Sequence, residues 1–374
     1  MTSLNNTSQL GIGIIGCGKI SQAYFDGAKI FSVLRLVACA DLHRPAAVLQ
    51  AEKNGCLALS VDELLAHPEI DLIINLTIPA AHAEVSLRAV GHRKHVYSEK
   101  PITVHLADAE EILRAAEEAG VRVGNAPDTF LGGGIQTCRR LIDEGAIGRV
   151  IAGTAFMLSS GPESWHPNPG FYYLEGGGPV LDMAPYYLTA LVNLIGPVRR
   201  VCGIVGKAHQ ERVATCAERN GEILPVEVAT HASATLEFVS GAIITAVFSF
   251  DVQAHAHHNI ELYGTEGSLK VPDPNTFSGP VSIYRNAPGE NQWAEVQLTH
   301  PYTANHRSIG AADMASAILN DRLHRANGHL ATHVLEVMHA IEKSSLENRY
   351  VEIERQVQRP HALPSDLELG QIDP

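Results

Sequence analysis

The sequence is poor in charged residues, in aromatic residues and in long apolar runs. Only 18% of its 374 residues are charged and only 6% are aromatic. Its apolar stretches have the length of strands, well short of the roughly 20 residues that a membrane helix needs. Neither a disordered tail nor a membrane protein has this composition. The 45% of hydrophobic residues suffices for large cores without a metal or a disulfide.

Basic residues are also scarce. The chain has 28 Lys and Arg against 41 Asp and Glu, which gives a net charge of −13. Nucleic-acid binding needs Lys and Arg clustered on one face, so we expect no nucleic-acid partner. Residues 1–9 are polar and uncharged, without the basic and apolar zones of a signal peptide. We therefore expect a cytoplasmic protein that does not bind membranes.

Cysteines are few and lack the close pairs of a zinc site or a disulfide framework. We interpret all six as reduced structural thiols: Cys17, Cys39, Cys56, Cys138, Cys202 and Cys216. The stretch with His255, His257 and His258 invites a metal interpretation. On a strand, however, the first two would face away from the third, and no nearby carboxylate completes a ligand set. We expect no metal.

The first 125 residues alternate short apolar runs with helical patterns, which is typical of βαβ units around a parallel sheet. Helix ends are recognisable, because Ser60 and Glu63 form a capping box and Gly120 follows an apolar stripe as a C-cap. Strands are expected at 12–15, 36–40, 72–76, 95–97 and 121–123.

The pattern changes after about residue 127. Residues 226–238 alternate strictly between apolar and polar side chains, which predicts a strand with one buried face. Further elements are expected at 134–144, 150–158, 242–251, 260–263, 281–285, 309–320 and 331–346. The predicted fold class is α/β. An N-terminal doubly wound parallel sheet (1–127) precedes a C-terminal α/β domain (128–374) with a large, mostly antiparallel, open-faced sheet.

Two overlapping glycine patterns compete for the role of a nucleotide-binding turn. Gly11, Gly13 and Gly16 spell G-x-G-x-x-G, but nothing strand-like precedes Gly11. Gly16, Gly18 and Ser21 follow the 12–15 strand and precede a helix expected from about residue 19. Only this register lets backbone amides and a helix N-terminus face a pyrophosphate. The predicted pyrophosphate contacts are Gly16, Gly18, Lys19 and Ile20.

A carboxylate supports this interpretation. Asp41 ends the second expected strand, where an acidic residue accepts hydrogen bonds from the adenosine ribose. The same carboxylate would repel a 2′-phosphate, so NAD is the expected cofactor. His43 and Arg44 leave NADP open, because a cation could hold that phosphate.

Several motifs occur in a fixed order along the chain. Thr77-Ile78-Pro79-Ala80-Ala81-His82 follows the expected strand at 72–76, and Glu99-Lys100-Pro101 follows the one at 95–97. Further on stand Gly176-Gly177-Gly178-Pro179-Val180-Leu181-Asp182 and Tyr263-Gly264-Thr265-Glu266-Gly267-Ser268-Leu269. With the Gly16 turn, the chain resembles the Gfo/Idh/MocA oxidoreductases over nearly its whole length. The resemblance implies a homodimer or homotetramer formed through the open face of the C-terminal sheet; the alternative is that this face is simply exposed to solvent.

The resemblance also implies site residues. Thr77, Pro79 and His82 would line the cofactor, although a histidine at a helix start can instead bind local backbone. Glu99 and Lys100 would lie beside the nicotinamide ribose and the substrate. Lys100 is the active-site lysine of the family.

Asp182 and Tyr186 lie four positions apart in an expected helix, so both project from one face. Many relatives have a histidine at the second position. We expect Tyr186 to be the principal acid/base, with Lys100 stabilising its phenolate and Asp182 orienting it. Tyr187 lies about 100° round the helix and is expected to pack, although Pro185 leaves open which ring enters the site.

The substrate is expected to be a small, neutral polyhydroxy compound. Residues 125–130 lack the arginine that many relatives carry there, which disfavours a phosphorylated or strongly anionic substrate. Trp165 and His166 would offer a sugar an aromatic face and a polar donor, and the alternative for their loop is a proline-rich surface turn. The expected function is an NAD(P)-dependent dehydrogenase acting on a sugar, inositol or related polyol. Two alternatives are an enzyme that retains NAD for glycoside hydrolysis or epimerisation, and a dinucleotide-sensing regulator.

Overall fold

The computed structural model describes residues 9–287 and 289–373, and the chain forms two compact units. The first unit contains the chain up to Leu131, together with His300–Ala331 and the segment from Leu363 onward. The second contains Gly132–Thr299 and Thr332–Ala362. The prediction of 1–127 and 128–374 treated each domain as one contiguous piece, and it did not include the two segments that return to the first unit.

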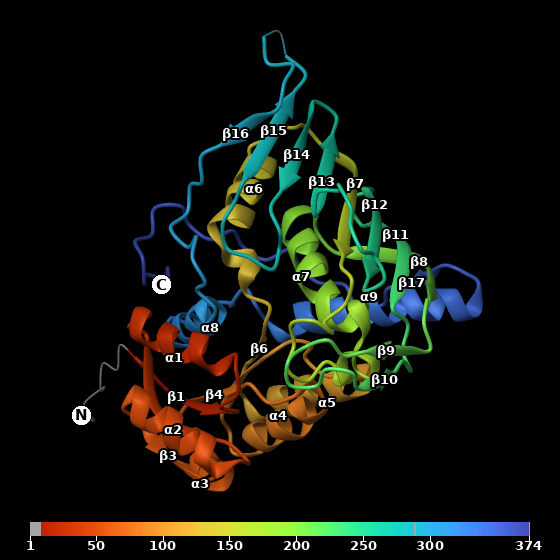
Figure 1. The fold of residues 1–374 in the computed structure, drawn as a ribbon. Helices are drawn as coiled ribbons and strands as arrows, with labels where there is room; N and C mark the ends of the chain where they lie inside the picture. Colours follow the sequence, from red (N-terminus) through yellow and green to blue (C-terminus); the bar gives the residue numbers. More distant parts are fainter. Residues whose placement is uncertain (1–8, 288, 374) are drawn as a thin grey trace. The chain divides into compact units, whose positions relative to one another are not determined.

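The first unit is built on a parallel sheet of six strands in the order β3-β2-β1-β4-β5-β6. Figure 1 labels β1, β3, β4 and β6 of this sheet. Its strands are β1 (Leu10–Ile15), β2 (Leu34–Ala40), β3 (Leu57–Ala58), β4 (Leu72–Asn75), β5 (His95–Ser98) and β6 (Val123–Asn125). Its helices are α1 (Ser21–Ile30), α2 (Arg44–Asn54), α3 (Val61–Ala66), α4 (His82–Gly91), α5 (Leu106–Ala119) and α8 (Ile309–Leu319), with short 3-10 turns η1 (Pro79–Ala81) and η2 (Thr129–Leu131). The predicted doubly wound sheet is confirmed.

Helix ends in this unit follow the sequence signals. Ser60 and Glu63 make both hydrogen bonds of the capping box at α3, as predicted. Gly120 ends α5 in the left-handed conformation, also as predicted. The last strand begins at Val123 and not at Val121, because the Val121 amide donates to Ala116 O and completes the helix end.

The returning segment His300–Ala331 completes the edge of the parallel sheet. Helix α8 packs against β6, and Gly124 pairs with Asn327 in an antiparallel bridge. A Cβ at Gly124 would lie 2.7 Å from the Met314 sulfur, so only glycine allows this approach. The edge strand is thereby covered.

Ion pairs attach the last segment to the same unit. Asp313 on α8 is fully buried and pairs with Arg322 at 2.9 Å and with Arg325. Arg325 also pairs with Asp373 at 2.7 Å. Each buried charge therefore has a partner of opposite sign, which offsets the cost of its desolvation.

The second unit is built on a sheet of nine strands in the order β16-β15-β14-β13-β7-β12-β11-β8-β17. The neighbours β7 and β12 run parallel and the other pairs are antiparallel, so the prediction of a mostly antiparallel sheet is confirmed. The strands are β7 (Val150–Leu158), β8 (Val198–Gly206), β11 (His231–Phe238), β12 (Ile243–Ser249), β13 (Ile260–Gly264), β14 (Gly267–Val271), β15 (Val281–Arg285), β16 (Ala294–Val296) and β17 (Val351–Glu352). The remaining elements are α6 (Gly133–Asp143), η3 (Gly170–Tyr173), α7 (Gly178–Ile195), the hairpin β9 (Glu211–Val213) and β10 (Ile223–Pro225), and α9 (Gly328–Glu347) from Thr332 onward.

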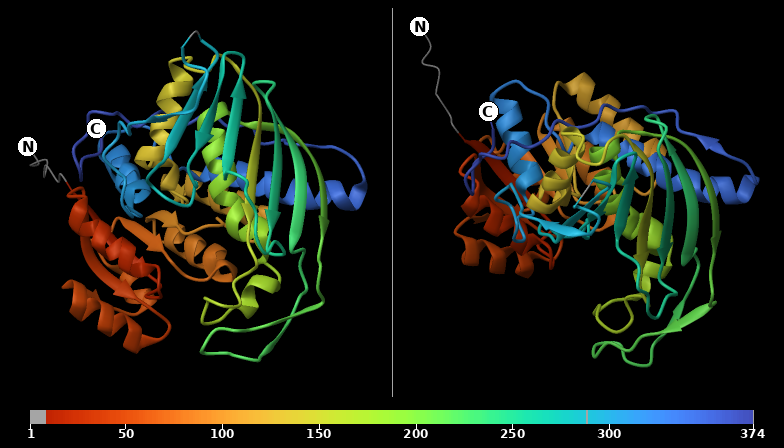
Figure 2. Two further views of the ribbon diagram at one scale, coloured as in Figure 1. Left: turned by 45° about the horizontal axis from the view of Figure 1, so that its top comes forward. Right: turned by 90° about the horizontal axis from the view of Figure 1, so that it is seen from above.

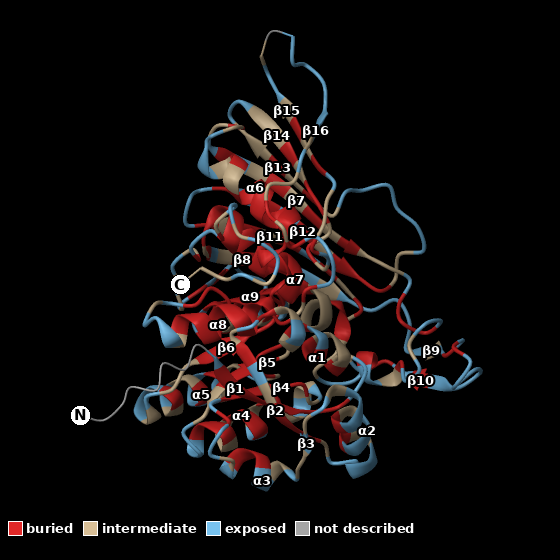
Figure 3. Ribbon diagram, turned by 90° about the vertical axis from the view of Figure 1, so that its left-hand side faces the viewer, coloured by how far each residue is buried: buried red, intermediate tan, exposed pale blue. Residues whose placement is uncertain are grey.

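Helices α6, α7 and α9 lie against one face of this sheet (Figure 2). The strand registers align one row of outward side chains across the other face, and the members of the row are exposed or half-exposed. Figure 3 shows the ribbon coloured by burial, with buried residues on the strands of both sheets. The row contains Cys202, Thr235, Thr245, Thr154, Glu261, Lys270 and Ser282.

One predicted strand was too long. Strand β11 begins at His231, whereas the prediction began at residue 226. The Val226 amide donates to Gln210 O and the Glu227 amide to Tyr173 O, so these residues bind loops and not the sheet. Within β11 the predicted alternation is confirmed, with Ala232 and Leu236 fully buried. No helix within 9–287 and 289–373 is long and apolar enough to cross a membrane.

Candidate functional site

The glycine turn lies between β1 and α1. Gly11 and Gly13 are inside β1, so the literal G-x-G-x-x-G is not at a turn, as predicted. Gly16 has a φ of +101°, and a Cβ there would lie 2.6 Å from Leu76 O. A Cβ on Gly18 would meet nothing within 4 Å. In this turn a side chain does not fit at Gly16, whereas the space beside Gly18 is open.

Lys19 is exposed and Ile20 is half-exposed at the start of the first helix. The helix begins at Ser21 and not at about residue 19, because the Ser21 amide and hydroxyl both donate to Gly18 O and form a turn first.

Asp41 lies directly after β2. Its Oδ2 accepts the amide of Cys17 at 2.7 Å, and its Oδ1 accepts the amide of His43 at 2.7 Å. Each carboxylate oxygen has a second lone pair, so the group retains acceptor capacity for ribose hydroxyls. Arg44 donates to Ala58 O at 3.1 Å, which holds its guanidinium toward β3.

Thr77 and Pro79 follow β4, and both are half-exposed. The Thr77 hydroxyl donates to Asn75 Oδ1 at 2.7 Å. His82 is fully buried, with Nδ1 2.7 Å from Pro101 O and Nε2 3.0 Å from Thr77 O. Burial lowers the pKa of His82, and the two carbonyl oxygens oppose that effect. The ring therefore binds local backbone, and its contact with a cofactor stays a prediction.

Glu99 and Lys100 follow β5, and both are half-buried. The carboxyl ends of β1, β2, β4 and β5 meet at one edge of the parallel sheet, where doubly wound folds bind ligands. Gly16, Asp41, Thr77 and Glu99 each follow one of these strands. The predicted cofactor residues of the first unit are thus brought to one edge.

Asp128 is a buried carboxylate whose role the sequence did not reveal. Its Oδ2 accepts the amides of Ser308 at 2.9 Å and Gly310 at 3.0 Å, at the start of α8. Burial raises the pKa of Asp128 to about 6, although the Gly310 amide, Arg307 and the Ser308 amide act in the opposite direction. The sequence contains no signal for this contact, because Ser308 lies 180 positions after Asp128.

Asp182 and Tyr186 lie on α7 in the second unit, the first half-exposed and the second buried. Tyr187 packs its ring 5.8 Å from that of Phe248, and its hydroxyl accepts the Asn259 amide at 2.8 Å. Burial raises the pKa of Tyr187, and Asp273 adds to the effect. The prediction that Tyr187 packs is confirmed, and the role of Tyr186 stays a prediction.

Trp165 and His166 belong to an aromatic cluster in the loop before α7. The Tyr172 ring lies 6.2 Å from Trp165, 5.1 Å from His166 and 4.1 Å from Phe171, which it stacks. Trp165 is 60% exposed and Phe171 is 42% exposed. The cluster therefore presents aromatic faces to solvent beside the helix that carries Asp182.

Arg212 on β9 fixes this loop. Its guanidinium pairs with Glu163 at 2.9 Å and with Asp251 at 3.3 Å, and it lies 5.6 Å from the centre of the Tyr173 ring. All three polar side chains are largely buried. No local sequence pattern indicates this group, because its members are far apart along the chain.

Two of the cysteines lie close together, and the histidine-rich stretch is exposed. Cys39 and Cys56 bring their sulfurs to 3.9 Å, and hydrogen bonding to Cys17 raises the pKa of Cys39 to about 12. The rings of His255 and His257 stack at 6.4 Å on an exposed segment. In the described part of the chain, no three His, Cys, Asp or Glu side chains are grouped to hold a metal ion.

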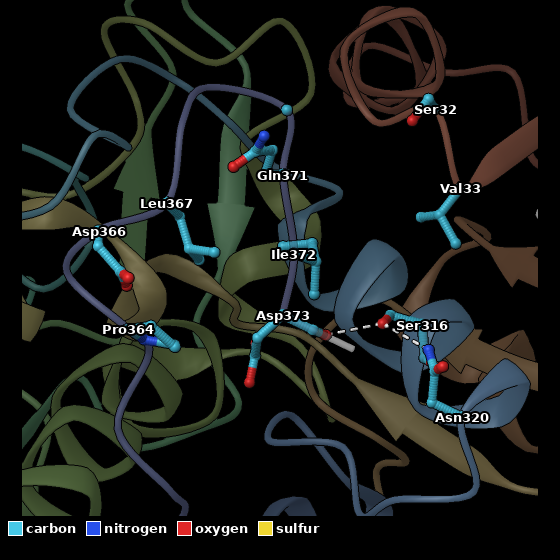
Figure 4. A pocket seen from close by; sticks show the side chains of 11 residues that line it. Ser32, Val33, Ser316, Asn320, Pro364, Asp366, Leu367, Gln371, Ile372 and Asp373 are labelled. Atoms are coloured by element: carbon cyan, nitrogen blue, oxygen red, sulfur yellow. Dashed lines mark hydrogen bonds between the residues drawn. The ribbon is translucent and has the colours of Figure 1, made fainter.

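A pocket of about 620 Å³ lies in the first unit between residues 32–33, α8 and residues 364–373 (Figure 4). Ser316 donates to Asp373 O at 2.8 Å on its wall. Ser32 and Val33 precede β2, so the pocket lies at the amino ends of the strands. Doubly wound sheets bind nucleotides at the carboxyl ends, so this pocket is not the expected cofactor site.

Comparisons with known proteins agree with both units. Residues 10–126 match an oxidoreductase family with an NAD-binding Rossmann fold, and residues 135–270 match the GFO/IDH/MocA C-terminal domain. The chain is 29% identical over 288 residues to a 1,5-anhydro-D-fructose reductase of Ensifer adhaerens, which covers 75% of this chain and 81% of the relative. It is 23% identical over 266 residues to a myo-inositol 2-dehydrogenase of Thermotoga maritima, which covers 69% and 74%.

The fold is similar to that of a solved levoglucosan dehydrogenase in complex with NADH. The TM-score is 0.78 at 19% sequence identity, and the match covers 93% of this chain and 100% of the other. At this identity the similarity concerns the fold alone.

Proposed function

Because the chain belongs to the Gfo/Idh/MocA oxidoreductases, a family with an NAD-binding Rossmann domain, we propose that it transfers a hydride between NAD and a neutral sugar, inositol or related polyol. The observation that carries the proposal is the edge of the parallel sheet where Gly16, Asp41 and Lys100 follow the carboxyl ends of β1, β2 and β5. A nucleotide turn, a ribose acceptor and an ionisable group at one edge are what such an enzyme needs.

The residues of the first unit fit the dinucleotide. Gly18 leaves open space where a phosphate would approach backbone amides, and Asp41 retains acceptor capacity for the adenosine ribose. NAD, when bound, supplies the hydride acceptor. The carboxylate of Asp41 favours NAD over NADP, because it would repel a 2′-phosphate.

Proton transfer is assigned to Tyr186 and Lys100. A tyrosine has an ordinary pKa near 10, so it needs a cation to act as a base at neutral pH. We assign this electrostatic role to Lys100 and an orienting role to Asp182, which lies one helical turn before Tyr186 on α7. Oxidation of a carbinol then proceeds with Tyr186 taking the hydroxyl proton.

Substrate binding is assigned to Trp165 and His166. The exposed indole of Trp165 suits the C–H face of a sugar ring, and the imidazole of His166 suits its hydroxyl groups. The segment after β6 has no arginine for a phosphate, which supports a neutral substrate.

A panel of sugars, inositols and sugar lactones, each tested with NAD and NADP, tests the proposal. We expect NAD reduction with at least one neutral member, and NADH oxidation with its keto product. Failure of every member in both directions overturns the proposal. Tightly retained NAD without net NADH would support the alternative of transient oxidation during hydrolysis or epimerisation. Cofactor binding without any turnover would support a sensing role.

We also propose that copies associate as a homodimer or homotetramer through the outward face of the nine-stranded sheet. Ile204 and Ile243 are 73% and 51% exposed on this face, among small and polar neighbours. Light scattering of the wild type and of Ile243→Glu tests this. A monomeric wild type would refute it.

A further inference from the structure

A buried tyrosine of α1 is hydrogen-bonded to the turn that carries Lys100. Tyr24 is fully buried, and its hydroxyl donates to Glu99 Oε1 at 2.8 Å. The other oxygen of that carboxylate accepts the backbone amide of Lys100 at 3.1 Å. One carboxylate therefore connects α1, which follows the glycine turn, with the backbone of Lys100.

The Tyr24 hydroxyl is a permanent donor. Burial raises the pKa of Tyr24 well above its ordinary value, and the negative charge of Glu99 adds to the effect. A hydrogen bond to an ionised acceptor is about twice as strong as one between neutral groups. The Tyr24 hydroxyl therefore keeps its proton and donates it to Glu99.

Two further buried side chains hold the backbone of the same turn. Asn125 Nδ2 donates to Ser98 O and to Glu99 O, each at 2.9 Å. On the other side the His82 ring lies 2.7 Å from Pro101 O. These contacts fix the main chain before and after Lys100. The Glu99 side chain is oriented by Tyr24 of α1.

We propose that Tyr24 is a positioning residue of the reaction, acting through Glu99 on the placement of Lys100. The inference rests on the proposed function, because Lys100 is assigned its chemical role there. Catalytic groups must be held within a fraction of an ångström of their productive geometry, and supporting hydrogen bonds supply that restraint. Tyr24 itself takes no part in proton transfer.

The test is Tyr24→Phe, which removes one hydroxyl and keeps the buried ring. Its matched control is Tyr263→Phe, because Tyr263 also donates to a glutamate, Glu261, at 2.9 Å but lies in the second unit. We expect kcat of Tyr24→Phe to fall about tenfold, with the KM for the sugar and the Kd for NADH within about twofold of wild type. The control should keep wild-type kcat. If Tyr24 had a purely structural role, Tyr24→Phe would lower the melting temperature or the number of NADH sites per chain. It would not lower kcat while leaving KM unchanged.

Amide hydrogen exchange of residues 98–103 provides a second readout that needs no substrate. We expect exchange in this segment to be about tenfold faster in Tyr24→Phe than in wild type, and unchanged in Tyr263→Phe. Glu99→Gln, which keeps the size of the side chain and removes one acceptor oxygen, should accelerate exchange in the same direction. If Tyr24→Phe does not fold, the exchange rate of residues 98–103 in Glu99→Gln tests whether the Glu99 side chain restrains this turn.

The outcomes separate the two proposals. A wild type without turnover on any sugar refutes the proposed function, and exchange still decides whether Tyr24 restrains the turn. An active wild type with unchanged kcat and unchanged exchange in Tyr24→Phe refutes the positioning role and leaves the function standing.

Discussion

The carboxylate of Asp41 accepts a 2.7 Å hydrogen bond from the backbone amide of Cys17. Cys17 lies inside the glycine turn, between Gly16 and Gly18, and Asp41 directly follows the neighbouring strand β2. The group assigned to the adenosine ribose is therefore attached to the turn assigned to the pyrophosphate. A change at Asp41 should affect both cofactor affinity and the choice between NAD and NADP.

We expect Asp41→Ser to raise the KM for NAD about tenfold. The ratio of kcat/KM with NAD to kcat/KM with NADP should fall by at least a further tenfold, because the variant lacks the carboxylate that repels a 2′-phosphate. Steady-state kinetics with both cofactors measure this. Asp71→Ser is the matched control, since Asp71 also accepts a glycine amide, that of Gly11 at 3.1 Å, but at the opposite edge of the sheet. An unchanged cofactor preference in Asp41→Ser would contradict the assignment.

Tyr186→Phe should lower kcat by a factor of about a hundred or more, because general acid/base groups contribute 10²–10⁴-fold. Tyr187→Phe is the control, since the Tyr187 hydroxyl binds Asn259 and its ring packs on Phe248. We expect that variant to lose less than about threefold. Near-normal turnover of Tyr186→Phe would move the role of acid/base to Lys100.

Local signals in the sequence were enough for much of the fold. The strand and helix pattern, the capping box at Ser60 and the register of the turn at Gly16 depend on neighbours within a few positions. The same holds for the alternation in β11, where one face is buried. Patterns with short periods carry this information directly.

Contacts between distant positions were not predictable in the same way. Tyr24 and Glu99 are 75 positions apart, and Asp128 and Ser308 are 180 apart. Nothing in the local pattern distinguishes Tyr24 from another apolar helix residue. The strand predicted from residue 226 was too long for a related reason. The backbone amides of Val226 and Glu227 donate to residues in loops, which are distant in the sequence.

Trp165 offers a direct binding signal. Since Trp165 and Trp293 are the only tryptophans in the sequence, Trp293→Phe leaves a single indole that is 60% exposed. We expect a sugar substrate to change the fluorescence of Trp293→Phe and not that of Trp165→Phe. We also expect Trp165→Ala to raise the KM for the sugar about tenfold, the equivalent of about 1.4 kcal/mol. A fluorescence change in Trp165→Phe, without one in Trp293→Phe, would refute the assignment of Trp165 to substrate binding.

Asp128 should make stability depend on pH. Its pKa is raised from 3.8 to about 6, so between these values the folded chain holds a proton that the unfolded chain has released. The stabilisation is present below about pH 4 and is lost as the pH rises through about 6, a change of up to about 3 kcal/mol.

Asp128→Asn removes this titration and leaves an oxygen to accept the amides of Ser308 and Gly310. We therefore expect the free energy of unfolding of the variant, relative to wild type, to increase by up to about 3 kcal/mol between pH 4 and pH 7. Urea denaturation at both pH values measures it. A difference that is independent of pH would show that the carboxylate titrates normally.

The return of His300–Ala331 to the first unit has a consequence for synthesis in the cell. Strand β6 emerges from the ribosome long before α8, which packs so closely on Gly124 that a Cβ there would touch Met314. Until then the nascent chain presents an uncovered strand edge, a surface prone to aggregation. A fragment ending at residue 131 should therefore require chaperones or aggregate, and the nucleotide-binding part should mature only once nearly the whole chain has been translated.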